Sequence, residues 1–459
     1  METPTPLSAL GSIQFPAIPD AQASLQLALQ YQFELSEWKS TGEIETAQFN
    51  QLHILLKHAQ QNVPYYTKLF EKHGIQLPER IDRAFLEKIP ISKRSDYQDC
   101  GDDFGSKKMP EGHGQMAVAR TSGSTGQPLK FGRSSITQTI WRALSTREHL
   151  WHGRDFTKKI GAIRLAPPDY APAPAGVQGN NWGAGVDKVF VSGPTVFLNA
   201  SSPLEGQLEW LMREKPSYLL SFPSSLVALT RYAEQKGISL PSITELRCVG
   251  EKLSVEHRAY LKDKWQTKVT DMYSCEEMGY IALQCPKNEH YHVQSESVLL
   301  EIVDENGRAC APGTRGRVVI TSLNNFVTPF IRYDIGDIAE YGVPCSCGRG
   351  LPVIQHIHGR TRNRLLLPNG ENRMPRLGEF VIYKKYDDAG IRQLKCIQHS
   401  LEKVELQIVA ARAFTEIEQK DLVDILLQNL EHNFTVELTF PAEILRNPNG
   451  KLEVFECRI

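Results

Sequence analysis

The strongest constraint on the fold is a regular alternation of helix and strand patterns between residues 204 and 274. Stretches with a helical spacing of apolar residues are separated by short runs rich in branched and aromatic residues. Helices that alternate with short apolar strands are typical of crossover connections in a parallel sheet. We therefore predict an α/β fold, with helices at 204–215, 224–237 and 254–265 and strands at 217–222, 243–251 and 268–274.

Helical patterns also dominate the part of the chain that precedes this region. Between residues 25 and 75, apolar side chains recur on one helical face from Leu52 to Ala59, which predicts a core-packed helix that ends before Pro64. A further helix is expected over 136–152. Glycine, proline and asparagine dominate 165–203, where we expect mainly loop.

The pattern changes to β-strand after residue 296, and Asn306-Gly307 predicts a turn between two of the strands. The last hundred residues show a strand, helix, strand order that is typical of a small α+β domain. We predict a flexible N-terminal arm at 1–20 and a large domain at 21–358, which contains mixed and parallel sheets and a β-rich part. A small, mobile α+β domain is expected at 359–459.

Composition argues against several classes of function. The 459 residues carry 52 basic and 53 acidic side chains, so that no global field favours nucleic acid or an anionic membrane. No run of about 18 apolar residues predicts a membrane span, and the first residues lack the features of a secretory signal. Nine scattered cysteines without such a signal do not indicate disulfides. We expect a cytoplasmic monomer or homodimer that binds neither nucleic acid nor membrane.

A loop rich in glycine and hydroxyl residues, TSGSTGQP, occupies residues 121–128. Such a loop is either a flexible linker or a cradle whose N–H and O–H groups converge on phosphate oxygens. A Walker loop is excluded, because that pattern requires a lysine after the second glycine and Gln127 stands there. The choice between linker and phosphate cradle depends on the rest of the chain.

Four later stretches follow the loop in a fixed order: DMYSCEEMGY at 271–280, IRYDIGD at 331–337, HGRTRNRLLLPNG at 358–370 and ILRNPNGKLEVF at 444–455. The second of them, IRYDIGD, predicts Asp337 in a tight turn after a strand. Together with the loop, these stretches resemble the adenylate-forming superfamily of acyl-CoA ligases, adenylation domains and luciferases. The earlier stretches NVPYYTKLF and LEKIPISKRSDYQD resemble its phenylacetate-CoA ligase and CapK-like branch.

The resemblance implies an acyl-CoA synthetase-like fold and a reaction that joins a carboxylate to the α-phosphate of ATP and expels pyrophosphate. The loop would then cover the β- and γ-phosphates. The residues implied in nucleotide binding are Thr121, Ser122, Gly123, Ser124, Thr125, Gly126, Gly250, Glu251, Tyr273, Ser274, Asp337 and Arg360.

Individual roles are implied in the same way. Tyr273 would stack on the adenine, with Gly250 and Glu251 lining the same pocket through their backbone. Asp337 would accept hydrogen bonds from the ribose hydroxyls, which requires an ionised carboxylate.

The catalytic residues implied are Glu277, Arg360 and Lys451. Glu277 would hold Mg²⁺, for which a carboxylate oxygen is a suitable ligand. Arg360 would assist at the ribose or the phosphates. Lys451 would be a mobile cation that meets the α-phosphate and the attacking carboxylate.

The chain departs from the superfamily pattern at three positions. Glu276 stands where a threonine or serine is usual, and this second carboxylate would either strengthen the metal site or repel phosphate. Gln127 replaces a lysine and removes a phosphate contact. Asn363 replaces the aspartate at which the small domain normally rotates, which weakens the case for the second, transfer half-reaction.

A cysteine and histidine cluster predicts a second metal. A stretch that contains Cys285, His290 and His292 begins sixty residues before the pair Cys345-Ser-Cys347. Thiolates combined with imidazole are ligands of structural Zn²⁺, and members of the resembled branch carry zinc. We predict that Cys285, Cys345, Cys347 and His292 bind zinc, with His290 as the alternative to His292; the other interpretation is free surface thiols.

The acid substrate is expected to contact Trp182, Phe190, Phe222 and Pro223, which favour an aromatic or apolar acid. The leading hypothesis is an enzyme that makes an acyl-adenylate and transfers the acyl group to a thiol of CoA or of a carrier protein. The alternatives are transfer to an amine or hydroxyl, a non-carboxylate substrate, or a degenerate nucleotide-binding module.

Overall fold

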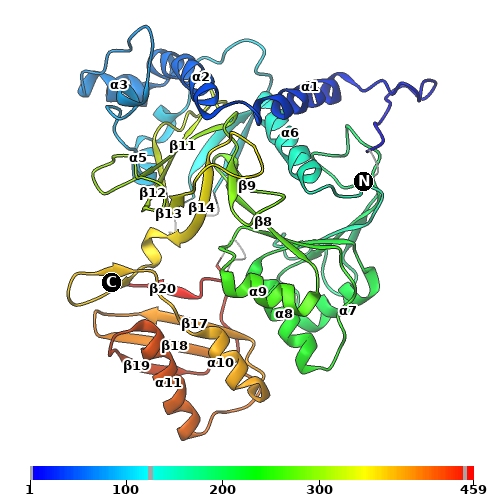
Figure 1. Cartoon of the computed structure of the whole chain (residues 1–459), viewed down its shortest axis with the longest axis vertical. Coiled ribbons are helices and arrows are strands. Elements are labelled where there is room, and N and C mark those ends of the chain that lie inside the picture. Colours follow the sequence, from blue (N-terminus) through cyan, green and yellow to red (C-terminus); the bar gives the residue numbers. More distant parts are fainter. Residues whose placement is uncertain (1–3, 122–127, 448–451) are drawn as a thin grey trace. The chain divides into compact units, whose positions relative to one another are not determined.

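The computed structural model describes residues 4–121, 128–447 and 452–459 (Figure 1). By their contacts, these residues form two compact units. Unit 1 comprises Met1–Lys159, Gly179–Thr195 and Asp271–Ile357, and unit 2 comprises Ile160–Gln178, Val196–Thr270 and His358–Ile459.

The N-terminal helices belong to unit 1, and α1 packs against α6 (Figure 1). A capping box of Ser40 and Glu43 begins α2, and the helix ends just before Pro64, whose ring cannot supply the next helical N–H. The predicted core face is confirmed, because Leu52 and Ala59 are fully buried. The helices are α1 (Ala21–Ser36), α2 (Thr41–Asn62), α3 (Pro64–Lys72), α4 (Arg83–Leu86), α5 (Arg94–Cys100), η1 (Gly101–Phe104) and α6 (Ser135–Trp151).

The β-rich part of unit 1 places its strands side by side in the order β11, β12, β13, β14, β10, β9, β8. The strand pairs β11/β12, β12/β13, β8/β9, β9/β10 and β10/β14 are antiparallel. A separate antiparallel hairpin of β1 (Met116–Arg120) and β2 (Lys130–Ser134) flanks the predicted phosphate loop. The other strands are β8 (Lys268–Cys275), β9 (Gly279–Gln284), β10 (Tyr291–Val293), β11 (Val298–Val303), β12 (Arg315–Ser322), β13 (Tyr333–Tyr341) and β14 (Val353–Arg360).

Unit 2 contains the predicted alternation of parallel strands and helices. Strands β3, β6 and β7 are parallel neighbours, and α7, α8 and α9 lie side by side (Figure 1). Two short strands, β4 and β5, lie where the sequence predicted mainly loop. The sequence did not reveal them, because they are too short to show a strand pattern among glycine and proline residues. The elements are β3 (Ile160–Arg164), β4 (Val177–Gly179), β5 (Thr195–Asn199), α7 (Leu204–Glu214), β6 (Tyr218–Ser221), α8 (Pro223–Gln235), β7 (Glu245–Val249) and α9 (Val255–Trp265).

The C-terminal part of unit 2 is a small α+β fold with its own apolar core. Its sheet has the order β19, β18, β17, β20, and α11 lies along the sheet (Figure 1). The elements after β14 are η2 (Thr361–Asn363), β15 (Leu365–Leu366), β16 (Asn372–Arg373), α10 (Glu379–Lys385), η3 (Asp387–Ala389), β17 (Gln393–Gln398), β18 (Lys403–Val409), α11 (Glu416–Leu430), β19 (Thr435–Thr439) and β20 (Phe455–Cys457).

The predicted fold class is therefore confirmed: an α/β chain with parallel and mixed strands, a β-rich part and a small C-terminal α+β fold. The predicted domain boundaries and the flexibility of the arm and of the small domain stay predictions. Within the arm, the N–H of Leu7 donates to the carbonyl of Val189 at 3.0 Å. In the described ranges, no helix is long and apolar enough to cross a membrane.

Candidate nucleotide site and metal centre

Two of the predicted nucleotide-binding side chains contact each other in unit 1. Tyr273 on β8 donates a hydrogen bond of 2.7 Å from its hydroxyl to Oδ2 of Asp337 on β13. Both residues are 8% exposed, so the carboxylate is held in one orientation within a largely buried setting. The neighbouring Ser274 also lies on β8 and is partly buried.

Asp337 lies within β13, so the prediction of a tight turn after a strand is wrong. The pairing of β12 with β13 shifts between Arg317 and Val319, which leaves residues 335–337 as a bulge. Gly336 takes a positive φ of 77° there, a conformation that a side chain disfavours. Gly336 and Asp337 thus lie in a kinked part of the strand, and the kink changes the direction of the Asp337 side chain.

The adjacent carboxylates of Glu276 and Glu277 have different surroundings. Glu277 has a side chain only 10% exposed; it pairs with Arg94 at 3.4 Å and accepts a hydrogen bond of 3.3 Å from Tyr333. Burial, followed by the Glu277 charge, raises the pKa of Tyr333, so that its hydroxyl stays a donor. The Glu276 side chain is 62% exposed and lies 3.9 Å from Arg133. The two carboxylates thus differ in exposure and in ion-pair partner, and the effect of Glu276 on a metal at Glu277 stays a prediction.

The base of the predicted phosphate loop is held by Arg94, a residue that sequence reasoning missed. Its guanidinium donates to Oγ1 of Thr121 and to Glu277. The N–H of Thr121 donates to the carbonyl of Leu129 at 2.9 Å, and Oγ1 of Thr121 accepts from the N–H of Leu129, also at 2.9 Å. These two hydrogen bonds close the base of the loop. The predicted residues Ser122, Gly123, Ser124, Thr125 and Gly126 lie outside the described residues.

Other predicted nucleotide-site residues lie in unit 2. Gly250 has a positive φ of 83°. Glu251, expected to act through its backbone, also uses its carboxylate: it accepts bonds of 3.0 Å from the N–H and the hydroxyl of Ser224, and one of 3.0 Å from the N–H of Leu452. Arg360 ends β14. Lys451 lies outside the described residues, directly before Leu452.

The aromatic residues predicted at the acid pocket make extensive protein contacts. The indole N–H of Trp182 donates to the carbonyl of Lys158 at 2.7 Å. The rings of Trp182 and Phe190 both pack on Phe156, with centroid distances of 5.0 Å and 5.4 Å respectively. Pro223 is the first residue of α8 and Phe222 precedes it, and both are buried. Packing accounts for these side chains, and their role in the acid pocket stays a prediction.

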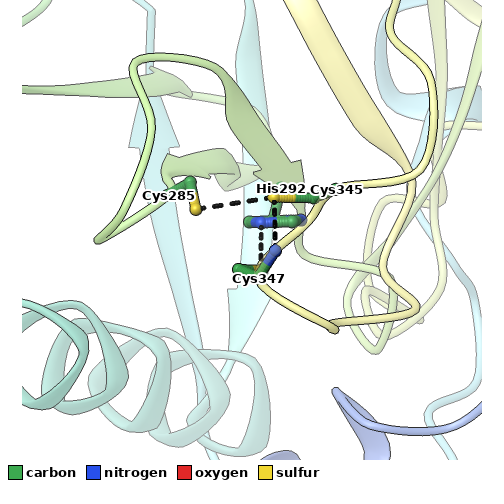
Figure 2. A group of neighbouring side chains, drawn as sticks. All are labelled: Cys285, His292, Cys345 and Cys347. Carbon is green, nitrogen blue, oxygen red and sulfur yellow. Dashed lines mark hydrogen bonds between the residues drawn. The ribbon is translucent and has the colours of Figure 1, made fainter.

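The predicted zinc ligands converge in unit 1 (Figure 2). The ligand atoms of Cys285, His292, Cys345 and Cys347 all lie within 4.8 Å of one another, and all four residues are buried. The Sγ atoms of Cys285 and Cys345 are 3.8 Å apart, and Nε2 of His292 lies 3.3 Å from Sγ of Cys347. Tetrahedral Zn²⁺, with bonds of about 2.3 Å to sulfur, places two sulfur ligands about 3.8 Å apart.

The protonation of the cluster suits a cation. Burial lowers the pKa of His292 to about 4, so its imidazole is neutral at pH 7 and offers a lone pair. Burial raises the pKa of Cys345 to about 11, so this thiol keeps its proton until a cation favours the thiolate. Nε2 of the alternative ligand His290 lies 2.9 Å from Sγ of Cys345.

The cluster is tied to the N-terminal helices. Arg349, two residues after Cys347, donates from Nε to Glu37 at 3.0 Å and lies over the Trp151 ring at 4.4 Å. A Cβ at Gly350 would overlap with the carbonyl oxygen of Lys39, so only glycine fits this close approach. The loop of Cys345 and Cys347 therefore helps to fix the junction between α1 and α2, as a structural metal site would.

Phenylacetate-coenzyme A ligases are similar in sequence to this chain over most of its length. A phenylacetate-coenzyme A ligase of Aromatoleum evansii is 27% identical over 359 residues, which cover 76% of this chain and 77% of that enzyme. A second phenylacetate-coenzyme A ligase, of Thermus thermophilus, is 24% identical over an alignment that covers 92% of this chain and 98% of the enzyme. No family model matches the chain.

Solved structures give the same fold. A 2-hydroxyisobutyryl-CoA ligase, in the postadenylation state with an acyl-AMP, superposes with a TM-score of 0.71 at 20% identity, covering 91% of this chain and 90% of that protein. The chain belongs to the adenylate-forming superfamily, as a phenylacetate-CoA ligase-like member. This confirms the resemblance seen in the sequence. This chain also superposes on an anthranilate CoA ligase with anthranoyl-AMP bound, with a TM-score of 0.54 at 16% identity over 73% of this chain and 64% of that protein.

Proposed function

We propose that this ligase joins a carboxylic acid to AMP at the expense of ATP, releases pyrophosphate, and then transfers the acyl group to the thiol of CoA. The observation that carries the proposal is the buried pair of Tyr273 and Asp337, which belongs to the same unit of an adenylate-forming fold as the Glu277 carboxylate. The phenylacetate-CoA ligases that the chain resembles support CoA as the acceptor.

In the first half-reaction, a carboxylate oxygen of the acid attacks the α-phosphorus of ATP, and pyrophosphate leaves. Asp337, oriented by Tyr273, accepts hydrogen bonds from the ribose hydroxyls, and the Tyr273 ring packs on the adenine. Glu277 would hold Mg²⁺, which neutralises phosphate charge when bound. Lys451 supplies a cation at the α-phosphate, and Arg360 assists at the ribose or phosphates.

In the second half-reaction, a thiolate attacks the acyl carbonyl carbon, and AMP leaves with the bridging oxygen. Asn363 stands in place of the usual hinge aspartate, which weakens the case for transfer to a thiol. Transfer to an amine or a hydroxyl is therefore the alternative. An aromatic or apolar acid stays the proposed substrate class, because the sequence predicts aromatic residues at its pocket, among them Trp182 and Phe222.

We further propose that Cys285, His292, Cys345 and Cys347 hold one structural Zn²⁺. Four protein ligands complete a tetrahedral shell, so the metal has no open position for chemistry. Its contribution is to hold the strand and loop segments together at the helix junction around Glu37.

A screen of pyrophosphate release across aromatic, branched and linear acids, run with and without CoA, tests this function. Release that depends on one acid class, together with a CoA thioester product, is the expected result. Acid-dependent release without a CoA product, but with an amide or ester when amines or alcohols are added, would replace CoA with the alternative acceptor. The absence of any acid-dependent release would contradict adenylation.

A further inference from the structure

The position of Arg94 between two nucleotide-site residues has a consequence for phosphate binding. Its guanidinium donates to the Thr121 hydroxyl at the base of the predicted phosphate loop and to the Glu277 carboxylate. Arg94 lies 27 positions before Thr121 and 183 positions before Glu277, and all three residues belong to unit 1. The cation is thus brought to the place where a phosphate-covering loop begins and where a metal ligand lies.

The backbone that carries Arg94 is fixed. Arg94 is the first residue of α5, and Tyr97 on the same helix is 1% exposed. The Tyr97 ring stacks on Phe104 at 4.0 Å and meets the edge of Tyr333 at 5.3 Å. Tyr333 in turn donates to Glu277, so the helix, the cation and the carboxylate share one buried aromatic support.

The contact between Arg94 and Glu277 is loose. Its 3.4 Å distance exceeds the range of about 2.7–2.9 Å that is usual for hydrogen bonds between a guanidinium and a carboxylate. The Arg94 side chain is 26% exposed, so solvent reaches it. A phosphate group offers a guanidinium more charge and a better-matched pair of oxygens than a single distant carboxylate oxygen does.

Charge balance points in the same direction. Glu277 is a carboxylate, and a pyrophosphate leaving group held through a metal at Glu277 adds several negative charges beside it. A single divalent metal ion does not neutralise this sum. Arg94 is a cation that the described residues of unit 1 place in contact with Glu277.

We propose that Arg94 binds the β,γ-phosphates of ATP and the departing pyrophosphate, exchanging its partner Glu277, which becomes available to Mg²⁺. The inference rests on the proposed function, since it assigns a residue to the leaving group of that reaction. In the protein without nucleotide, Arg94 neutralises the Glu277 charge; with nucleotide, it acts on the phosphates that AMP lacks.

The test is a comparison of ligands that carry or lack those phosphates. Binding of Mg²⁺-pyrophosphate, Mg²⁺-ATP and AMP to the full chain is measured by calorimetry for the wild type, Arg94→Met and Arg94→Lys. Arg133→Met is the matched control, because Arg133 is the cation beside the neighbouring carboxylate of Glu276.

Arg94→Met should weaken the binding of pyrophosphate and ATP tenfold or more and change AMP binding less than twofold. Arg94→Lys should recover part of the affinity, because it keeps the charge and loses the planar fork. Arg133→Met should leave all three affinities within twofold of the wild type.

Two results would overturn the inference alone: pyrophosphate binding within twofold of the wild type in Arg94→Met, or an equal loss of AMP and pyrophosphate binding, which indicates a structural role. If Arg94→Met does not fold, Arg94→Lys decides by the same ratio of pyrophosphate to AMP affinity. Wild-type protein that binds neither AMP nor ATP would overturn the proposed function, and the inference with it.

Discussion

The hydroxyl of Tyr273 donates a 2.7 Å hydrogen bond to Oδ2 of Asp337, which joins β8 to β13 across a largely buried site. A hydrogen bond of this length fixes the carboxylate before a nucleotide arrives, and preorganised acceptors bind without paying for reorientation. The same bond ties the residue assigned to the adenine to the residue assigned to the ribose. Both assignments can therefore be tested by nucleotide binding alone.

Asp337→Ala should weaken AMP binding about 10- to 150-fold, because hydrogen bonds to a charged group contribute roughly 1.5–3 kcal/mol. The wild type should lose a similar factor with 2′,3′-dideoxy-AMP, whereas the variant should not distinguish the two nucleotides. Calorimetric titration measures both. A variant that still prefers the ribonucleotide would show that another group reads the ribose hydroxyls.

Cys345→Ser or Cys347→Ser should remove zinc and lower the unfolding temperature by several degrees, because a metal bound only to the folded state stabilises it by about 2.7 kcal/mol at a hundredfold excess over its dissociation constant. Elemental analysis of protein purified without chelator should give about one Zn²⁺ per chain. Wild-type protein that contains no zinc when purified without chelator, and that melts at the same temperature as Cys345→Ser, would reject the site.

His292→Gln should lose zinc, whereas His290→Gln should retain it. Nε2 of His292 faces Cys347 at 3.3 Å and belongs to the cluster of ligand atoms, while His290 contacts Cys345 from a less buried position. Zinc content of the two purified variants decides between them. The reverse pattern would assign His290 as the fourth ligand.

The ion pair of His257 on α9 with Glu379 on α10, 2.9 Å long, should make stability depend on pH. Burial lowers the pKa of His257, but the hydrogen bond and charge of Glu379, with Glu251 and Glu256, outweigh it, so the pKa is raised above 6.5. The stabilisation is thus complete below the unfolded-state pKa and is lost as the pH rises through the higher folded-state value.

His257→Gln should therefore lower the melting temperature more at pH 5.5 than at pH 8.5, with a loss of about 1.5–3 kcal/mol at the acidic end. Glutamine still donates a neutral hydrogen bond, so the variants should converge when the histidine is uncharged. Glu379→Gln is the matched change in the partner and should show the same trend. A difference that grows with pH would contradict the sign of the shift.

Lys451→Ala should reduce adenylation by a factor of hundreds, which corresponds to roughly 3–4 kcal/mol of transition-state stabilisation, and leave ATP affinity little changed. Transfer from synthetic acyl-adenylate to CoA should survive, because the proposed cation acts at the α-phosphate in the adenylation step only. Single-turnover assays of each half-reaction measure this. Equal loss of both would mean that the two steps share one arrangement of Lys451.

The sequence predicted the elements whose side-chain spacing is regular over several turns or strands. The core-packed helix from Thr41 to Asn62 and the parallel strands of unit 2 are such cases. The cluster of Cys285, His292, Cys345 and Cys347 was predictable for a different reason. Few kinds of side chain bind metals, so these residue types indicate metal binding even where sixty residues separate Cys285 from Cys345.

Features that depend on tertiary pairing were not predictable. The bulge that holds Asp337 arises from a register shift between β12 and β13, which no local pattern encodes, and glycine followed by aspartate is equally typical of a turn. Arg94 lies in the stretch LEKIPISKRSDYQD, whose resemblance to the branch implied no role for this residue, and its partner Glu277 is 183 residues away. Only the assembled unit shows that this arginine reaches the base of the predicted phosphate loop.

The joining of a carboxylate to the α-phosphate of ATP is tested most directly by oxygen transfer. The enzyme is incubated with ATP, Mg²⁺, CoA and an accepted acid whose carboxylate carries ¹⁸O, and the products are analysed by mass spectrometry. An acyl-adenylate pathway predicts AMP that contains one ¹⁸O atom, together with unlabelled pyrophosphate. ADP as the nucleotide product, with the label in inorganic phosphate, would contradict it.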